Sequence, residues 1–359
     1  MPEIMQFVPI LIVGFAASLA LTPLSRQIAM RLGFVDKPNQ RKIHLDNKPM
    51  MGGLAIYIAL TIALLLFSPP RHVAALGAVL AGAAALAVLG LIDDRYDLSW
   101  RSKTIVQVMA AFGIVLTGVR MHLTGIVLID VLATVFWIFA ITNAINYLDN
   151  MDGQSAGVTA IAAFFFVLIA FTQGLSLVSL LAAAVLGSAV GFLVYNFNPS
   201  STFMGDMGAL PLGFILSVLA IKLKFDQPFS LDWLIPVFVL ALPVLDVNLV
   251  TWTRIFEGRS PTEAGKDHTA HRIMSLGLGQ RPTLALIYSF CGVFGFLGLL
   301  LSATPEAIGL RLSVFGLLLI ALYVMVMVWL RQHYHKQPSQ QPVSSLAHDL
   351  EQIPHPQAK

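Results

Sequence analysis

Six aspartates lie at the ends of apolar stretches in a chain that otherwise carries few charges. They are Asp93, Asp94, Asp97, Asp149, Asp152 and Asp206. Clustered carboxylates repel each other where water is scarce, and a hard divalent cation is the usual way to hold them together. Oxygen ligands favour Mg²⁺ or Mn²⁺, and bound Mg²⁺ keeps open positions for substrate phosphates. Gly205 and Gly208 flank Asp206 and would let the backbone approach a phosphate closely. Each loop alone would be read as a solvated turn, but together they predict a metal and phosphate site.

The stretch 143–157 places three polar residues at three-residue intervals after a long apolar segment. These are Asn146, Asp149 and Asp152, and Gly153 follows them directly. On a continuing helix such residues lie near one face, and a glycine readily ends the helix. The spacing therefore predicts that the two aspartates lie close together at the end of a helix.

A late polar loop supplies positive charge. His268 and His271 stand three residues apart, between Lys266 and Arg272. Two imidazoles, an ammonium and a guanidinium in so short a stretch form a suitable cradle for a diphosphate. A zinc site would need further soft ligands, and no cysteine lies in these loops. His44, in the first basic loop, would extend the same positive wall, although an ordinary cytoplasmic loop explains it nearly as well.

The composition predicts an integral membrane protein. Hydrophobic residues make up 57% of the 359 and charged residues 11%, against about 25% charged in soluble domains. We expect an all-α, polytopic fold with about eleven transmembrane helices, the first of which is retained as a span. The expected segments are 4–25, 52–68, 73–92, 103–119, 126–146, 155–172, 175–195, 207–222, 232–253, 283–302 and 308–330.

The basic residues are distributed unevenly along this chain. The connections after odd-numbered segments, with the C-terminal tail, hold 17 of the 22 lysines and arginines. The positive-inside rule then places the N-terminus outside and the C-terminus and all these polar loops in the cytoplasm, at the inner (plasma) membrane. We expect residues 1–332 to form one transmembrane catalytic domain. Residues 333–359, rich in Gln, Pro, Ser and His, are expected to form a disordered cytoplasmic tail.

Asp246 differs from the other carboxylates because it lies inside the ninth apolar segment. An ionisable residue within a membrane helix indicates a function by default, and the expected partner is a basic group or Asn248. Since Arg254 is two turns further on, Asp246 could alternatively reach the cytoplasmic interface. Pro236 and Pro243 predict a kink in this helix, which would open a groove for a lipid tail.

Five motifs within residues 26–282, taken as a set, resemble the polyprenyl-phosphate N-acetylhexosamine-1-phosphate transferases (glycosyltransferase family 4). They are PMMGG (49–53), DDRYD (93–97), NYLDNMDG (146–153), FMGD (203–206) and DHTAHR (267–272). Two departures are Asn150, where the family often has glycine, and GDMGA in place of the commoner GDAGS. HTAHR also lacks the run of three histidines typical of the branch that acts on phospho-MurNAc-pentapeptide. This difference, together with DDRYDLS (93–99), favours the N-acetylhexosamine branch.

The resemblance implies roles for individual residues. Asp206 would bind Mg²⁺ (or Mn²⁺), with Asp94 as a second ligand. Asp93 or Asp94 would deprotonate or orient the lipid phosphate, with Asp93 favoured, and His268 would contact the diphosphate. The expected catalytic residues are Asp93, Asp94, Asp149 and His268. The expected substrate-binding residues are Asn146, Asp152, His271, Arg272, Lys103, Arg101 and His44.

The resemblance also implies a reaction. GlcNAc-1-phosphate would pass from a UDP-sugar to undecaprenyl phosphate with release of UMP, as the first membrane step of a cell-wall or other envelope polysaccharide. Two anions must meet, so the protein's main tasks would be charge neutralisation and alignment. The expected partners are the UDP-sugar, the polyprenyl phosphate and the membrane, with no nucleic acid. A homodimer stays open.

Four alternatives stay open at this point. The first is phospho-MurNAc-pentapeptide transfer in peptidoglycan synthesis. The second is a membrane prenyltransferase, since DDRYD fits a DDxxD signature. The third is a membrane alcohol-phosphotransferase, although Ala156 and Gly157 stand where that motif requires Ala-Arg. The fourth, an ion-coupled transporter, should place polar groups near the membrane midplane, where only Asp246 qualifies. The polar loops favour an enzyme.

Overall fold

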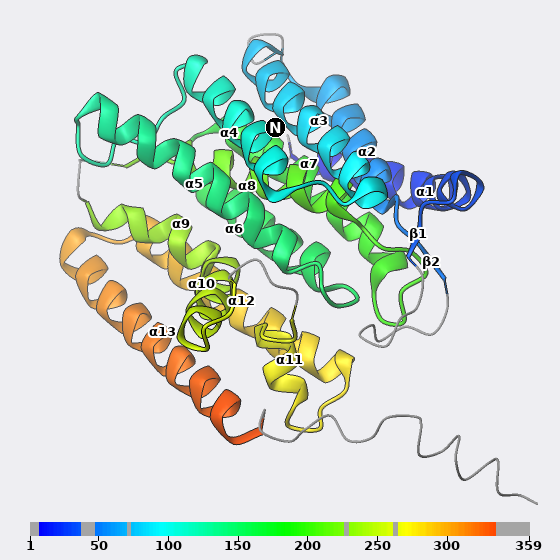
Figure 1. Ribbon diagram of the computed structural model, residues 1–359. Helices are drawn as coiled ribbons and strands as arrows, with labels where there is room; N and C mark the ends of the chain where they lie inside the picture. The colour runs from blue at the N-terminus through cyan, green and yellow to red at the C-terminus, as the bar shows by residue number, and fades with distance from the viewer. Residues whose placement is uncertain (1–6, 37–46, 70–72, 226–229, 261–264, 335–359) are drawn as a thin grey trace, which may run out of the picture.

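The computed structural model describes residues 7–36, 47–69, 73–225, 230–260 and 265–334, and almost all its regular elements are helices (Figure 1). Its two short strands, β1 (Val35–Asp36) and β2 (Lys48–Pro49), pair antiparallel. The helices are α1 (Val8–Leu32), α2 (Gly52–Phe67), α3 (Val73–Tyr96), α4 (Trp100–Leu116), α5 (Val127–Tyr147), α6 (Gln154–Thr172), α7 (Ser176–Asn196), α8 (Asp206–Ile221), the 3-10 turn η3 (Leu231–Trp233), α9 (Leu234–Val239), α10 (Ala241–Phe256), α11 (Thr269–Met274), α12 (Gln280–Ala303) and α13 (Glu306–Tyr334). The predicted helical class is confirmed for these residues.

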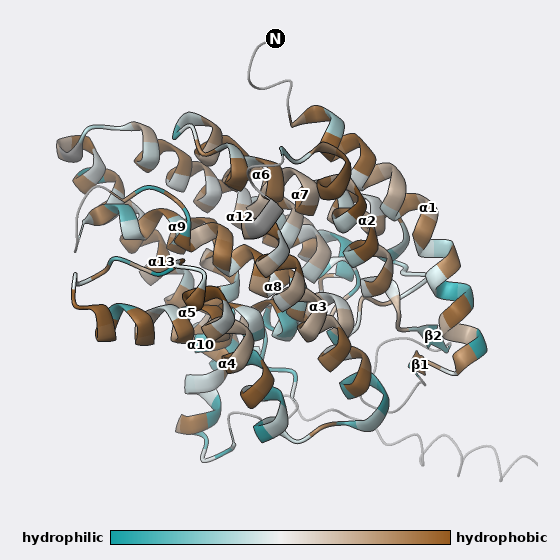
Figure 2. Ribbon diagram, turned by 90° about the horizontal axis from the view of Figure 1, so that it is seen from above, coloured by the Kyte–Doolittle hydropathy of each residue, from teal (hydrophilic) through white to brown (hydrophobic). Residues whose placement is uncertain are grey.

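Among the described residues, seven helices are long and apolar enough to cross a membrane, or eight if the bent pair α9–α10 counts as one span. Most of the helical ribbon is hydrophobic, whereas hydrophilic residues gather mainly at helix ends and connections (Figure 2). Two further apolar helices, α2 and α8, have only 16 residues each. By length and composition the expected count of eleven spans is not confirmed, and it stays a prediction.

α8 lies at the centre of the bundle. Every residue from Met207 to Ile221 is buried, as expected for a helix that is apolar on all sides. Helices α2, α3, α5, α6 and α7 pack around it. The first residue of α8, Asp206, therefore lies where several helix ends meet.

The ninth apolar segment is bent, as its prolines predicted. α9 and α10 meet at an angle of 82°. Pro243 has no N–H to donate to the carbonyl of Val239, which is the last residue of α9, so the helix cannot continue regularly through this point. The bend separates a short outer piece from α10, the helix that carries Asp246.

The predicted helix through Asp152 is wrong. α5 ends at Tyr147, and both Asp149 and Asp152 follow in a turn. The side-chain amide of Asn150 donates to the carbonyl of Tyr147 at 2.7 Å, because short polar side chains bond to nearby backbone and favour turns. Gly153, at φ 77°, precedes α6 as its N-cap instead of ending α5.

Candidate active site

The end of α3 meets the beginning of α8. Oδ1 of Asp94 accepts the backbone N–H of Asp206 at 3.1 Å, and Oδ2 accepts that of Met207 at 3.4 Å. The first N–H groups of a helix have no partner within it, so a carboxylate at this end is favourable. Asn146, near the end of α5, donates to Oδ1 of Asp206 at 2.7 Å. Residues from three helices thus converge on Asp206.

Asp93 faces α4. Its Oδ2 lies 2.5 Å from Nζ of Lys103, and its Oδ1 accepts the backbone N–H of Leu98 at 2.8 Å. The same carboxyl group lies beside that of Asp206. Lys103, a predicted substrate-binding residue, is therefore an ion-pair partner within the site, and its charge offsets part of the negative charge there.

Asp149 completes a group of four carboxylates, which we call the acidic cluster: Asp93, Asp94, Asp149 and Asp206. Burial and the nearby charge of Asp206 raise the pKa of Asp149 to about 7. Within the described ranges, the one ion pair found for this cluster joins Asp93 to Lys103. The acidic cluster therefore has more carboxyl groups than basic groups paired with them.

Glycines allow the backbones around Asp206 to approach each other. A Cβ at Gly90 of α3 would lie 2.3 Å from the carbonyl carbon of Asp206, and one at Gly53 of α2 would lie 2.2 Å from the nitrogen of Gly208. Real side chains do not tolerate such distances. The glycine pair of PMMGG thus packs directly on the helix start that follows FMGD.

Asp152 faces a different loop. Its Oδ2 accepts the backbone N–H of Ser200 at 3.0 Å and the amide of Asn198 at 3.1 Å, and its Oδ1 accepts the Ser200 hydroxyl at 2.8 Å. Lys48 also reaches this loop and donates to the carbonyl of Ser200 at 2.6 Å. In this arrangement Asp152 orders the loop before α8, and its predicted contact with substrate stays a prediction.

His268 lies next to the end of α5. Its ring centroid is 6.3 Å from that of Tyr147, edge to face, and Tyr147 directly precedes the turn that carries Asp149. Nδ1 of His268 lies 2.7 Å from Oδ2 of Asp246. Asn248, the alternative partner proposed for that carboxylate, donates to the carbonyl of Val244 instead. The partner of Asp246 is therefore a histidine from a loop distant in sequence.

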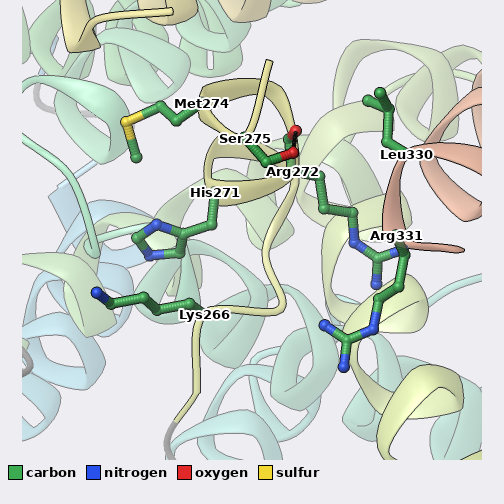
Figure 3. A pocket seen from close by; sticks show the side chains of 7 residues that line it. All are labelled: Lys266, His271, Arg272, Met274, Ser275, Leu330 and Arg331. Carbon is green, nitrogen blue, oxygen red and sulfur yellow. Dashed lines mark hydrogen bonds between the residues drawn. The ribbon is translucent and has the colours of Figure 1, made fainter. Parts of the chain in front are cut away.

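A cavity of about 270 Å³ lies between α11 and the end of α13. It is lined by Lys266, His271, Arg272, Met274, Ser275, Leu330 and Arg331. The side chains of Lys266 and His271 lie next to each other on one side, and those of Arg272 and Arg331 lie together on the other (Figure 3). Burial and the nearby basic groups His268 and Lys266 lower the pKa of His271 to about 4. His271 is therefore neutral at neutral pH.

Arg272 is extensively bonded within the protein. Its Nε donates to the carbonyl of Asp267 at 2.8 Å, its Nη1 to that of Met327 at 3.0 Å and its Nη2 to the hydroxyl of Thr253 at 2.7 Å. Each guanidinium nitrogen thus already has an acceptor. These bonds anchor α11 to α10 and α13, and the predicted substrate contact of Arg272 would have to be made in addition to them.

An ion-pair network surrounds Asp267. Its carboxylate lies 3.1 Å from Arg254, 2.9 Å from Arg259 and 2.6 Å from Arg331, and Arg331 also binds Glu257 at 2.6 Å. Burial alone would raise the pKa of Asp267, but hydrogen bonds from Arg259 and Arg254 hold it well below its usual range. This network fastens the histidine loop to two helices.

Two predicted residues remain. Arg101 is exposed, and its guanidinium lies 5.5 Å from the ring centroid of Trp100. His44 lies outside the described residues. Sequence reasoning did not identify Tyr147 as a neighbour of His268, nor the bond of 2.5 Å between Thr269 and Tyr323 that ties α11 to α13. No local pattern signals either contact, because both join distant segments.

The acidic cluster suits Mg²⁺. Its donors are carboxyl oxygens, and they outnumber the basic groups that could neutralise them. Among the residues that the structure describes, no three His, Cys, Asp or Glu side chains form a complete metal site. Mg²⁺ is usually held by one or two carboxylates, with water and substrate phosphates completing the shell.

These features define a helical membrane protein with an acidic site at converging helix ends, and comparison with known proteins identifies its family. The profile of glycosyl transferase family 4 matches residues 76–224. The chain is 33% identical to a probable undecaprenyl-phosphate N-acetylglucosaminyl 1-phosphate transferase of Bacillus subtilis, over 90% of this chain and 92% of the relative. It is 30% identical to a decaprenyl-phosphate N-acetylglucosaminephosphotransferase of Mycolicibacterium smegmatis, over 76% of each. An undecaprenyl-phosphate alpha-N-acetylglucosaminyl 1-phosphate transferase of Escherichia coli is 26% identical, over 77% of this chain and 78% of the relative. The chain belongs to glycosyl transferase family 4, as its motifs predicted.

Proposed function

We propose that this protein transfers GlcNAc-1-phosphate from UDP-GlcNAc to a polyprenyl phosphate and releases UMP. The observation that carries this proposal is the convergence of the acidic cluster with Tyr147 and His268 at one end of the bundle. The names of the relatives, which specify undecaprenyl or decaprenyl phosphate and N-acetylglucosamine, support the same reaction.

In this reaction an oxygen of the lipid phosphate bonds to the sugar-linked phosphorus, and the bond to UMP breaks with its electron pair leaving on UMP. Asp93, oriented by Lys103 and Leu98, orients the lipid phosphate or takes its remaining proton. That phosphate is already largely ionised at neutral pH, since its second pKa is about 6. In-line alignment and charge neutralisation are therefore the main tasks.

The metal would be held by Asp206, with Asp94 as the second carboxylate. Asn146 fixes the Asp206 side chain for this role. When bound, Mg²⁺ would supply positive charge against the charge that develops on the leaving phosphate. Arg101 and Lys103 would attract the anionic substrates, and His268 would contact the diphosphate.

We further propose that this end of the bundle faces the cytoplasm at the plasma membrane, with the N-terminus outside. The excess of basic residues in the corresponding loops supports this orientation. α8 has 16 residues and is about 24 Å long, shorter than the ~30 Å hydrocarbon core. With its polar end at the membrane surface, the other end of α8 would lie within the hydrocarbon core.

A direct assay tests the function. Purified protein would be incubated with undecaprenyl phosphate, Mg²⁺ and one of UDP-GlcNAc, UDP-GalNAc, UDP-glucose or UDP-MurNAc-pentapeptide, and UMP would be measured. We expect release from UDP-GlcNAc that requires the lipid and is chelator-sensitive. Preferred turnover of UDP-MurNAc-pentapeptide would contradict the proposed donor, and lipid-independent release would contradict the transfer.

A further inference from the structure

The carboxylate of Asp246 binds two successive residues of the histidine loop. Its Oδ2 lies 2.7 Å from Nδ1 of His268, and its Oδ1 accepts the backbone N–H of Thr269 at 2.6 Å. Asp246 is only 1% exposed, and the His268 side chain is 10% exposed. Both oxygens therefore hold the start of α11 in place, where His268 is the N-cap and Thr269 the first helical residue.

This contact determines which ring nitrogen of His268 can meet a ligand. An ionised carboxylate can only accept hydrogen bonds, so Nδ1 must carry the hydrogen in the bond to Asp246. Nε2 is then the ring nitrogen left for a ligand, and within the described residues no hydrogen bond to it is found. The ring of Tyr147 lies edge to face with the imidazole and limits its rotation further.

A purely structural role would not require a carboxylate at this depth. Capping the N–H of Thr269 needs only one acceptor, which a neutral asparagine or serine provides. A charged side chain within a membrane helix is costly and is kept where it has a function. The second carboxylate oxygen distinguishes Asp246 from a neutral cap, because it accepts a hydrogen bond from the imidazole of His268.

We propose that Asp246 is a positioning residue that acts through His268. It accepts the hydrogen of Nδ1 so that Nε2–H of the doubly protonated ring can donate to the diphosphate of the nucleotide sugar, in the way that buried carboxylates orient histidines and stabilise the imidazolium in other active sites. This role rests on the proposed function. Asp246 itself does not touch the substrate.

A double-mutant cycle tests this role. The variants are Asp246→Asn, His268→Ala and the double variant, and kcat and KM for UDP-GlcNAc would be measured for each. In Asp246→Asn one amide oxygen can accept only one of the two N–H groups, and the amide NH₂ opposes the other, so His268 loses its fixed position. We expect each single change to lower kcat/KM by about 10²–10³-fold, as for loss of one positioned donor. The double variant should lie within about threefold of His268→Ala, because residues that act as a unit are not additive.

A binding measurement and a matched control complete the test. Saturating UDP-GlcNAc should raise the thermal-unfolding midpoint of the wild type, and this increase should shrink alike in both single variants. Asn248→Ala, two residues away with an exposed side chain bonded to Val244, should behave as wild type. If Asp246→Asn does not fold, the kcat/KM of the double variant can still be compared with that of His268→Ala. In the double variant the imidazole is absent, so the asparagine needs to accept only the N–H of Thr269.

Failure of this role differs from failure of the proposed function. Losses that multiply in the double variant, or an Asp246→Asn protein with normal kcat/KM, would overturn the role while wild-type turnover remains. A wild type that releases no UMP from UDP-GlcNAc would overturn both the function and the role.

Discussion

Oδ1 of Asp94 lies 3.1 Å from the backbone nitrogen of Asp206, although 112 residues separate the two in sequence. The carboxylate at the end of α3 thus caps the N-terminus of α8 and fixes the position of the Asp206 backbone, from which its side chain extends. DDRYD and FMGD therefore form one structural unit, and a substitution in either motif should disturb the geometry of the other.

Asp206 and Asp152 should respond differently to the same substitution. Asp206→Asn should abolish turnover with little change in the thermal-unfolding midpoint, because an amide is a poor ligand for Mg²⁺. Asp152→Asn should lower the midpoint, since it weakens three hydrogen bonds to the loop before α8. Calorimetry and UMP release measure the two effects. Near-normal turnover of Asp206→Asn at the same Mg²⁺ concentration would place the metal elsewhere.

Lys103→Ala should reduce kcat/KM by at least about tenfold, since removing one partner of a largely buried ion pair leaves the other charge uncompensated. Lys103→Arg should retain more activity because it keeps the charge beside Asp93. Arg101→Ala is the matched control on the same helix and should cost less than about threefold, because its exposed charge acts only at long range. Equal losses at both positions would show that general electrostatic attraction explains the effect.

Gly90→Ala should prevent normal folding or assembly of the site. The added Cβ would lie 2.3 Å from the carbonyl carbon of Asp206, which is backbone and cannot move aside cheaply. Overpacking of this kind costs about 1–3 kcal/mol or more. Gly77→Ala, in the same helix with no atom within 4 Å, is the control. The yield of monodisperse protein in detergent measures the difference, and equal yields and activities would contradict the close packing of Gly90 on Asp206.

The network around Asp267 predicts a stability loss in acid. Because the folded state holds the pKa of Asp267 below its usual range, the ionised group stabilises the fold above about pH 4, near the unfolded value. This contribution is lost as pH falls further. The midpoint of Asp267→Asn should be lower than that of wild type at pH 7 and should fall less between pH 5 and 3. Asp97→Asn, at an exposed position, should follow the wild type, and parallel curves for all three proteins would refute the role of the network.

The proposed orientation predicts opposite labelling at the two ends of α4. On a Cys291→Ala background, a cysteine at Thr117 should react with an impermeant thiol reagent added to intact cells, and one at Ser99 should react only after permeabilisation. Both positions are exposed. The reverse pattern would place the acidic cluster on the outer face.

Local sequence patterns located most helices because burial in a membrane requires long apolar runs. They failed between Tyr147 and Gly153, where the three-residue spacing suggested a continuing helix. Side-chain bonds to the backbone and to the loop before α8 stabilise a turn there instead. Periodicity reports which face a helix would bury, but it does not report competing hydrogen bonds from segments distant in sequence.

The sequence by itself determined the membrane class, the family motifs and the types of residue available for binding a metal and a diphosphate. Only the tertiary structure decided which of them meet. The pairing of Asp246 with His268, the capping of α8 by Asp94 and the neutralisation of Asp93 by Lys103 each join side chains from different helices or loops of the bundle. Composition and spacing are local properties of the chain, whereas a hydrogen bond requires two groups within about 3 Å of each other in space. For the first two of these contacts, only the packed bundle brings the two groups together.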